Sequence, residues 1–254
     1  MRLYFIFLIF LSFLNSAYSN DTKNSGRLVL AADDWCPFTC TETNSQGLGI
    51  VPDIVKEALS GSSFEMKYKM MNWARSIEMA KQNDIQGILG AYKSDVPQFL
   101  FSNKPQVISR DCIYGLSHKK LNYTELKSLK DKKVGIVNGY SYGEEVDQFK
   151  ASEDGKKIFF ETSGDDPLKQ NIKKILAERI DFILENELVI KYSALHDADV
   201  KKLKSFACLS PKEIYAAFNN VDTRNAEVIK ILNKFMESKK GQSFIKATLL
   251  KYSK

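Results

Sequence analysis

The sequence predicts an α/β protein, and three observations support this fold class. Short apolar, β-branched runs alternate with amphipathic stretches from residue 27 onward, a pattern typical of layered helices and mainly parallel strands. The chain of 254 residues is long enough to form two lobes, each with its own core. Its 44% hydrophobic and 27% charged residues are typical of globular proteins and exclude collagen-like or wholly disordered chains.

The first segment of the chain has the composition of an export signal. Arg2 precedes an uncharged apolar run over 3–14, and Ala-Tyr-Ser at 17–19 is followed by a polar stretch. The apolar run is shorter than the ~20 residues of a membrane-spanning helix, and a small-x-small triplet is typical of signal peptidase cleavage. We expect residues 1–19 to be a cleavable signal peptide, with an uncleaved anchor as the alternative.

Strands and helices are expected to alternate along the rest of the chain. The apolar runs predict strands at 28–32, 64–70, 85–91, 112–116, 133–137, 157–161, 181–184 and 214–218. Pro52, Asn72 and Pro167 are suited to helix starts, and they predict helices over 52–59, 72–82 and 167–178. Two final helices, over 223–238 and 241–251, are expected to cover one side of a finished sheet. Ligands of such α/β proteins bind in a crevice beyond the carboxyl ends of the strands.

The four cysteines of an exported chain are expected to form disulfides. Three pairings are possible. Cys36 and Cys40 are close in sequence, which favours a bond between them and leaves Cys112 to pair with Cys208. A zinc site is disfavoured because this single C-x-x-x-C has no second pair of ligands near it. We expect no metal and no cofactor.

The basic balance of the chain does not indicate nucleic-acid binding. The formal net charge is +6, but 31 of the 37 basic residues are lysines and only six are arginines. Recognition of phosphates and bases depends on the bidentate guanidinium group. The lysine pairs are scattered between apolar segments, as on a solvated surface, so we expect no nucleic-acid partner.

A series of motifs lies along the chain, several of them in loops that follow the expected strands. In chain order they are Trp-Cys-Pro-Phe at 35–38, Gly-Ile-Val-Pro-Asp at 49–53, Asn-Trp-Ala-Arg-Ser at 72–76, Asn-Asp-Ile-Gln-Gly-Ile-Leu-Gly at 83–90, Phe-Ser-Asn-Lys-Pro at 101–105, Leu-Lys-Asp-Lys-Lys-Val-Gly-Ile-Val-Asn-Gly at 129–139 and Leu-Ala-Glu-Arg-Ile-Asp at 176–181. In this order and spacing they resemble the bacterial extracellular solute-binding proteins of family 3. These are periplasmic receptors best known for serving polar amino acid ABC transporters. The resemblance covers about residues 27–251.

The resemblance implies a two-lobed, periplasmic-binding-protein-like fold of type II with two hinge crossovers. We expect the crossings near residues 110–114 and 213–217. Lobe 1 would comprise residues 20–111 and 214–254, and lobe 2 residues 112–213. Such a protein would be a periplasmic monomer that closes around a small-molecule ligand and works with a membrane permease or sensor.

Candidate ligand-binding residues of the first lobe lie near the ends of its strands. The resemblance places Trp35 and Phe38 in an aromatic wall, where a rigid ring supplies contact area at low entropic cost, with a core position for one of them as the alternative. Trp73, near a helix N-terminus, can also face the cleft. Arg75 is a candidate to bind an anion, with a surface ion pair as the alternative role. Tyr92 follows the third strand, and its hydroxyl is expected to point at the ligand.

The second lobe offers Asn-Gly-Tyr-Ser-Tyr-Gly at 138–143, between a strand and a helix. Amide groups at that helix N-terminus, with the hydroxyls of Ser141 or Tyr142, would form a cradle for an anion or carboxylate. The alternative is an ordinary helix cap made by Ser141. The position of this turn within the family-like series favours ligand contact.

Two departures from the family pattern bear on the ligand. Family receptors usually carry Thr-x-x-Arg to bind the α-carboxylate, whereas this chain has Tyr-Lys-Ser-Asp95 there. The aspartate that usually holds the α-ammonium is replaced by Asn186, which follows Glu185. A zwitterionic amino acid therefore lacks its usual partners. Lys93 or Arg75 could replace the first partner, and Glu185 or Asp95 the second.

The expected function is capture of a small polar ligand by hinge closure and delivery to an ABC-type permease. The ligand class includes amino-acid-derived and aromatic molecules. One alternative is a dehydratase-like periplasmic enzyme on the same fold, with Asp95 or Glu185 as general acid or base. Another is a receptor for a membrane sensor. His118 and His196 form no recognisable catalytic motif with Ser, Asp or Cys, so we expect no enzyme.

Overall fold

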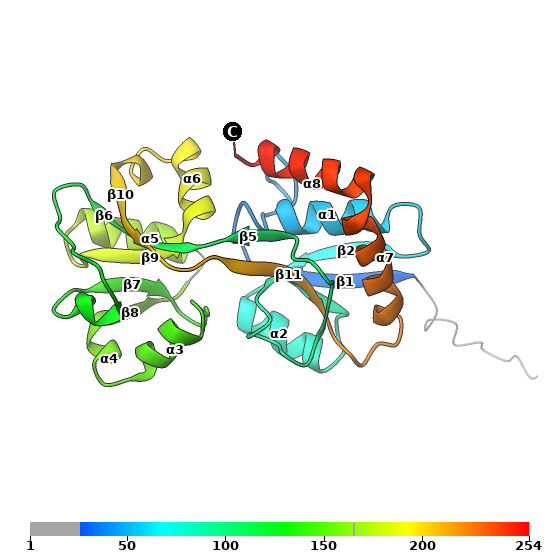
Figure 1. Ribbon diagram of the computed structural model, residues 1–254, viewed down its shortest axis with the longest axis horizontal. Helices are drawn as coiled ribbons and strands as arrows, with labels where there is room; N and C mark the ends of the chain where they lie inside the picture. Colours follow the sequence, from blue (N-terminus) through cyan, green and yellow to red (C-terminus); the bar gives the residue numbers. More distant parts are fainter. Residues whose placement is uncertain (1–25, 165, 254) are drawn as a thin grey trace, which may run out of the picture.

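The protein consists of two α/β halves that lie side by side, each with its own sheet (Figure 1). The structure is a computed structural model that describes residues 26–164 and 166–253. The α/β fold class expected from the sequence is confirmed. The expected signal peptide over 1–19 lies outside the described residues. Within the described part of the chain, no helix is long and apolar enough to cross a bilayer.

The first half contains a sheet in the order β2-β1-β3-β11-β4, with β5 paired to β11. Its strands are β1 (Arg27–Ala32), β2 (Glu65–Met70), β3 (Gly87–Ala91), β4 (Leu100–Phe101), β5 (Val107–Ser109) and β11 (Lys212–Phe218). Its helices are α1 (Ile50–Leu59), α2 (Trp73–Lys81), α7 (Asn225–Glu237) and α8 (Lys239–Lys251). The two C-terminal helices pack on α1, so they cover one side of this sheet, as expected (Figure 1).

The second half contains a sheet in the order β10-β6-β9-β7-β8. Its strands are β6 (Asp111–Leu116), β7 (Val134–Val137), β8 (Phe159–Thr162), β9 (Phe182–Asn186) and β10 (Leu203–Cys208). Its helices are α3 (Glu144–Ala151), α4 (Gly155–Ile158), α5 (Pro167–Leu176) and α6 (Glu187–His196), with short 3-10 turns η2 (Leu126–Leu129) and η3 (Val200–Lys202).

The expectation of mainly parallel sheets is wrong, because both sheets are mixed. The pairs β1–β2, β1–β3, β7–β8 and β7–β9 are parallel, as βαβ units require. The pairs that involve β6 or β11 are antiparallel. Both strands enter their sheet directly from the other half of the molecule, without a crossover helix, and so are free to run in the opposite direction.

Several element boundaries also differ from the expected ones. The segment at 157–161 begins within the one-turn helix α4, and its strand starts only at Phe159. Strands β4, β5 and β10 were not expected; β4 and β5 are two and three residues long, too short to show an alternating pattern. Helix α6 was also not expected, since its apolar residues are not confined to one face.

Two crossings of the chain join the halves. Arg110 alone separates β5 from β6, and residues 209–211 separate β10 from β11. The crossings lie side by side because β11 pairs with β5, with Lys212 opposite Ser109 (Figure 1). The second crossing therefore precedes the expected position at 213–217, since β11 already belongs to the first sheet from Lys212 onward.

Two disulfides are present, one in each half, in the pairing favoured by the sequence. Cys36 is bonded to Cys40 in the loop after β1. Cys112 is bonded to Cys208, where β6 and β10 pair beside the crossings. The second bond therefore ties together the two strands through which the chain enters and leaves the second half.

Candidate functional site

A small cavity lies between the two halves. Its volume is about 30 Å³, room for one or two water molecules. The lining residues come from loops and strand ends of both sheets: Asp33, Trp35, Trp73, Gly90, Tyr92 and Asp95 from the first half, and Asp111, Tyr140, Ser141, Tyr142 and Glu185 from the second. A larger solute therefore enters only if the halves separate.

Three aromatic rings come from the first half. Trp35 follows β1, Trp73 begins α2 after β2, and Tyr92 follows β3. Because β1, β2 and β3 are parallel, their carboxyl ends meet at one edge of the sheet and bring these rings together. The Trp35 ring packs on Phe38 with 4.3 Å between centroids and meets the Tyr92 ring edge-on at 6.2 Å. The rings form an apolar wall of the cavity.

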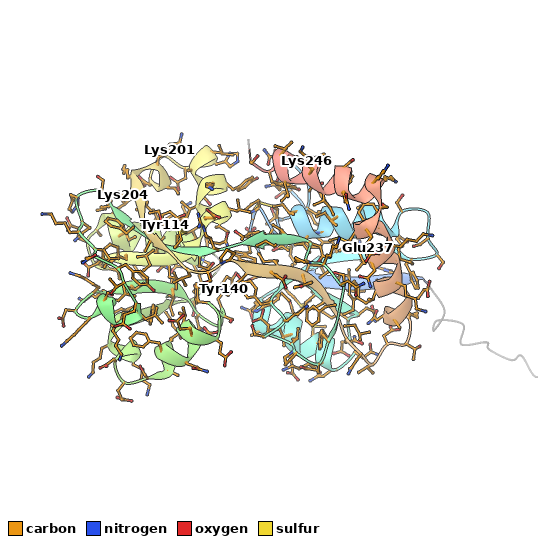
Figure 2. The ribbon with its side chains drawn as sticks, in the orientation of Figure 1. Tyr114, Tyr140, Lys201, Lys204, Glu237 and Lys246 are labelled. Atoms are coloured by element: carbon orange, nitrogen blue, oxygen red, sulfur yellow. A yellow bond between two sulfur atoms is a disulfide. The ribbon has the colours of Figure 1, made fainter. Side chains whose placement is uncertain are left out.

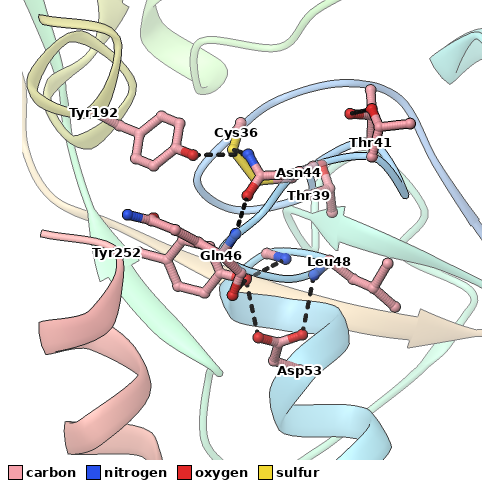
Figure 3. The surroundings of a disulfide bond; sticks show 12 residues. Cys36, Thr39, Thr41, Asn44, Gln46, Leu48, Asp53, Tyr192 and Tyr252 are labelled. Carbon is pink, nitrogen blue, oxygen red and sulfur yellow. Dashed lines mark hydrogen bonds between the residues drawn. A yellow bond between two sulfur atoms is a disulfide. The ribbon is translucent and has the colours of Figure 1, made fainter. Parts of the chain in front are cut away.

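The loop that carries Trp35 is held by covalent and hydrogen bonds (Figure 3). The Cys36–Cys40 disulfide closes the turn directly after the ring. At the end of the loop, the Tyr252 hydroxyl accepts from the Gly49 N–H at 2.7 Å, and it donates to the Asp53 carboxylate in the first turn of α1 at 2.9 Å. Tyr252 lies beyond the end of α8, so the C-terminal segment fastens this loop to the first half. These bonds hold in place the loop that presents the Trp35 ring.

The polar groups of the second half are oriented by hydrogen bonds in the turn after β7. The Tyr142 hydroxyl accepts from the Val137 N–H at 2.8 Å. The Asp147 carboxylate accepts from the Ser141 hydroxyl at 2.5 Å and from the Tyr142 N–H at 3.0 Å. Because Asp147 lies in the first turn of α3, the predicted cradle is already satisfied by an internal carboxylate.

Hydrogen bonds connect the halves directly. The Tyr140 hydroxyl, from the second half, donates to the Asp33 carboxylate of the first, and Tyr140 lies at the junction of the halves (Figure 2). Away from the cavity, the Asn44 side-chain amide donates to the Tyr192 hydroxyl at 2.7 Å (Figure 3). The structure therefore shows the halves in contact, with Tyr140 across the cavity.

The first half contributes two carboxyl groups with raised pKa values. Burial raises the pKa of Asp33 to about 6, although the hydrogen bond from Tyr140 lowers it. Burial also raises the pKa of Asp95 to about 6, against the hydrogen bond from the Tyr92 N–H, which donates at 2.9 Å. Both groups change charge near neutral pH.

The second half contributes two further carboxyl groups, both almost fully buried. Burial raises the pKa of Glu185 to about 7, opposed by the hydrogen bond from the Asn186 N–H. The Trp35 Nε1 atom is buried without a hydrogen bond of normal geometry, but it lies near enough to Glu185 to lower this pKa. Burial also raises the pKa of Asp111, opposed chiefly by the Lys212 ammonium.

Lys212 contacts two residues that line the cavity, Asp111 and Tyr92. Its Nζ lies 2.5 Å from Asp111 Oδ2; the Asp111 side chain is buried and that of Lys212 is partly buried. The same ammonium lies 4.2 Å from the centroid of the Tyr92 ring, a cation–π geometry. Asp111 and Lys212 begin the strands that follow the two crossings, so their ion pair is located at the hinge.

The structure brings five of the expected ligand residues to the cavity: Trp35, Trp73, Tyr92, Ser141 and Tyr142. The other three do not line it. Phe38 is fully buried in the core behind Trp35. Arg75 is exposed on α2. Asn186 is buried at the hinge, where its side chain caps α6 and accepts from the Ser109 hydroxyl at 2.7 Å.

Sequence reasoning missed Asp33, Asp111, Tyr140 and Lys212. Asp33 directly follows β1, and Tyr140 lies in a motif already singled out, so both had a positional signal. Asp111 and Lys212 had no such signal. Each begins a strand directly after a crossing, β6 and β11, and the two residues become neighbours only because the crossings lie side by side. Glu185 and Asp95, considered as substitute partners for an ammonium group or as a general acid or base, both line the cavity.

No cluster of three or more metal-ligating side chains is present among residues 26–164 and 166–253. The cavity carboxyl groups are instead held by donors from the protein, including Tyr140 and Lys212. Their arrangement, next to several rings, is chemically suited to binding a small molecule and to exchanging protons near neutral pH.

Comparisons with known proteins identify the fold. No family model and no curated protein matches the sequence. Among solved structures, a histidine kinase sensor domain similar to periplasmic binding proteins matches with a TM-score of 0.73 and 14% identity, over 89% of this chain and 95% of that one. The chain has the two-lobed periplasmic-binding-protein fold.

Two other matches with this fold are ancestral proteins. An ancestral arginine-binding protein bound to arginine has a TM-score of 0.71 and 17% identity, over 89% of this chain and 98% of that one. An ancestral amino-acid-binding protein, a precursor of cyclohexadienyl dehydratase, has a TM-score of 0.69 and 16% identity, over 90% of this chain and 96% of that one. Binding proteins, a sensor domain and a forerunner of an enzyme thus share this architecture.

Proposed function

We propose that this protein is an exported solute-binding protein that captures a small polar molecule between its two halves. The observation that carries this proposal is the cavity itself, which is built from strand ends of both sheets and lies beside the two crossings. A site shared by two hinged bodies is completed only when they close. The aromatic wall supplies contact area, and the polar groups of both halves supply orientation.

The mechanism is closure around the solute. The two halves act as lobes that rotate about residue 110 and residues 209–211. In the closed arrangement Tyr140 and Asp33 join the lobes, and the Asp111–Lys212 pair stays at the hinge. Solute that contacts both lobes stabilises the closed arrangement over the open one by its difference in affinity for the two.

We further infer that the closed form is recognised by a membrane partner, and we assign no catalysis to the cavity. Delivery to an ABC-type permease is supported by the family-like motif series, and presentation to a membrane sensor by the structural match to a sensor domain. A general acid or base role for Glu185 or Asp95 is the enzyme alternative. Recovery of the solute after incubation separates binding from catalysis.

The test is a thermal-shift screen of the mature chain followed by analysis of the bound compound. A ligand at a hundred times its Kd raises the stability by about 2.7 kcal/mol. We expect at least one small polar compound to raise the Tm, to reduce the radius of gyration in solution scattering, and to be recovered unchanged. Recovery of a converted compound would establish an enzyme instead.

A further inference from the structure

We propose that the cavity selects an organic cation, an amine without a neighbouring carboxylate, rather than a zwitterionic amino acid. This inference rests on the proposed function and names the ligand class of the same cavity. It follows from the signs of the charges around the cavity and from the rings between them.

The charges that line the cavity are acidic in excess. Four lining residues are carboxylic acids, Asp33, Asp95, Asp111 and Glu185, and no described lining residue is Lys, Arg or His. Lys212 is paired with Asp111 at 2.5 Å and so offsets one of the four. Three carboxyl groups remain, and their protein partners are neutral donors: a tyrosine hydroxyl and two backbone N–H groups.

Neutral donors orient a carboxylate but do not cancel its charge. Glu185 is only 5% exposed, so water screens its charge poorly. A ligand ammonium next to these groups would be attracted to all three, whereas a ligand carboxylate would be repelled and would find no guanidinium. The ligand is therefore expected to bring positive charge and to lack an anionic group near it.

The rings around the cavity fit the same ligand. Trp35, Trp73, Tyr92, Tyr140 and Tyr142 all line it, and the Trp35 ring makes edge-type contacts with both Tyr92 and Tyr140. Aromatic faces attract cations, and this attraction strengthens where water is excluded. Lys212 already stacks over Tyr92 at 4.2 Å, so the protein itself uses one of these rings to hold an ammonium group.

Tyr140 indicates where the ligand ammonium would bind. Its hydroxyl donates to Asp33 across the cavity, and its ring contacts Trp35 edge-on at 6.3 Å. When the lobes open, Asp33 loses this donor, and an ammonium group can take its place between Asp33 and the aromatic wall. The lobes then close around the ligand with Asp33 still satisfied.

The experiment compares amines with the amino acids that differ from them by one carboxylate. Agmatine is tested against arginine, putrescine against ornithine, and tyramine against tyrosine, by calorimetry at pH 8, where the carboxyl groups are ionised. We expect at least one amine to bind about tenfold or more tightly than its parent amino acid. Equal or tighter binding of the parents would overturn the inference.

Two variants test the site. Glu185→Gln and Asp95→Asn should each weaken binding of the selected amine by about tenfold, while Glu227→Gln on the exposed face of α7 should leave it unchanged. Asp95 is only partly buried, so its variant remains informative if Glu185→Gln fails to fold. Unchanged affinity in the folded variants would also overturn the inference.

The outcomes separate this inference from the proposed function. Binding of only neutral or anionic compounds from the wider screen would overturn the cation inference and leave a solute-binding protein. Conversion of an amine would support the cation inference and overturn the assignment as a binding protein. Failure of every compound in both sets to bind would overturn both.

Discussion

The two halves of the molecule build their sides of the cavity in different ways. The first half presents rings that are fixed by packing, such as Trp35 on the buried Phe38 and Trp73 in the core beside β1 and β3. The second half presents polar groups that are fixed by hydrogen bonds, such as Ser141 and Tyr142 on Asp147. The first half thus fixes its rings by packing and the second fixes its polar groups by hydrogen bonds, while each half contributes two carboxyl groups.

This difference affects how well each side can be predicted. A ring near a strand end can be recognised in a short sequence motif, because that one residue by itself supplies the contact area. A hydrogen-bond network distributes its function over residues that become neighbours only after folding. The variants below compare the two halves, beginning with the largest expected effect.

The largest expected difference between the halves is in how much each disulfide contributes to the unfolding free energy. The Cys112–Cys208 bond spans 96 residues and the Cys36–Cys40 bond spans four. In the chain-entropy model the longer loop contributes about 4.7 kcal/mol and the shorter about 2 kcal/mol. We expect Cys112→Ala with Cys208→Ala to lower the guanidinium unfolding free energy by the larger amount. An equal or larger loss on removing Cys36 and Cys40 would contradict this comparison.

The pH dependence of stability is expected to be dominated by Glu185 of the second half. Its pKa is raised from 4.5 to about 7, chiefly by burial and also by Asp111, and is lowered by Asn186, Trp35 and Lys212. Between these values the folded state binds more protons than the unfolded state. The unfolding free energy should therefore fall as pH rises from 4.5 through 7, by about 3 kcal/mol for this group.

Urea unfolding of the ligand-free protein between pH 4.5 and 8 measures this slope. Glu185→Gln should flatten it, because the amide does not titrate. Asp95→Asn in the first half should flatten only the part below about pH 6. A stability that increases over this pH range and is insensitive to Glu185→Gln would show that the carboxyl group is ionised in the folded state.

Removing a ring should weaken binding more than removing a hydroxyl. Trp35→Ala deletes a large ring of the aromatic wall and should weaken binding of the selected amine by about tenfold. Ser141→Ala should weaken it by less than about threefold, because that hydroxyl is already bonded to Asp147. Calorimetry on both variants measures the two losses of affinity and hence their ratio. A larger effect of Ser141→Ala would assign the main ligand contact to the second half.

The Tyr140–Asp33 hydrogen bond should control how closed the ligand-free protein is. Tyr140→Phe removes the hydrogen bond to Asp33 and should destabilise the closed arrangement by about 1 kcal/mol. Solution scattering should show a larger radius of gyration. Tyr142→Phe is the matched control, because its hydroxyl bonds only within the second half, to Val137. The same expansion in both variants would rule out a specific role for Tyr140 in closure.

Arg75→Ala should have the smallest effect. The side chain is exposed on α2 and does not line the cavity, so affinity for the selected amine should change by less than about twofold. Calorimetry at low ionic strength is the most sensitive measurement of this change. A tenfold loss would show that Arg75 contributes to the site after all.

Much of the fold could be predicted because its signals are local. The alternation that predicts β1, α1 and β2 is a property of neighbouring residues, and Pro167 does occupy the first position of α5. The direction of β6 and β11 could not be predicted in this way. It depends on two crossings between sheets, and neither leaves a periodic pattern in the sequence.

The sequence by itself determined the α/β class and the cysteine pairing that is favoured by spacing. It also indicated that the rings of Trp35, Trp73 and Tyr92 lie near strand ends, at the edge where the cavity forms. Only the tertiary structure decided the charge of the site. It paired Lys212 with Asp111 across more than a hundred residues of sequence and placed Arg75 in solvent. The physical reason is that ring position follows from local strand geometry, whereas the charge of a cavity depends on every group that long-range packing brings to it.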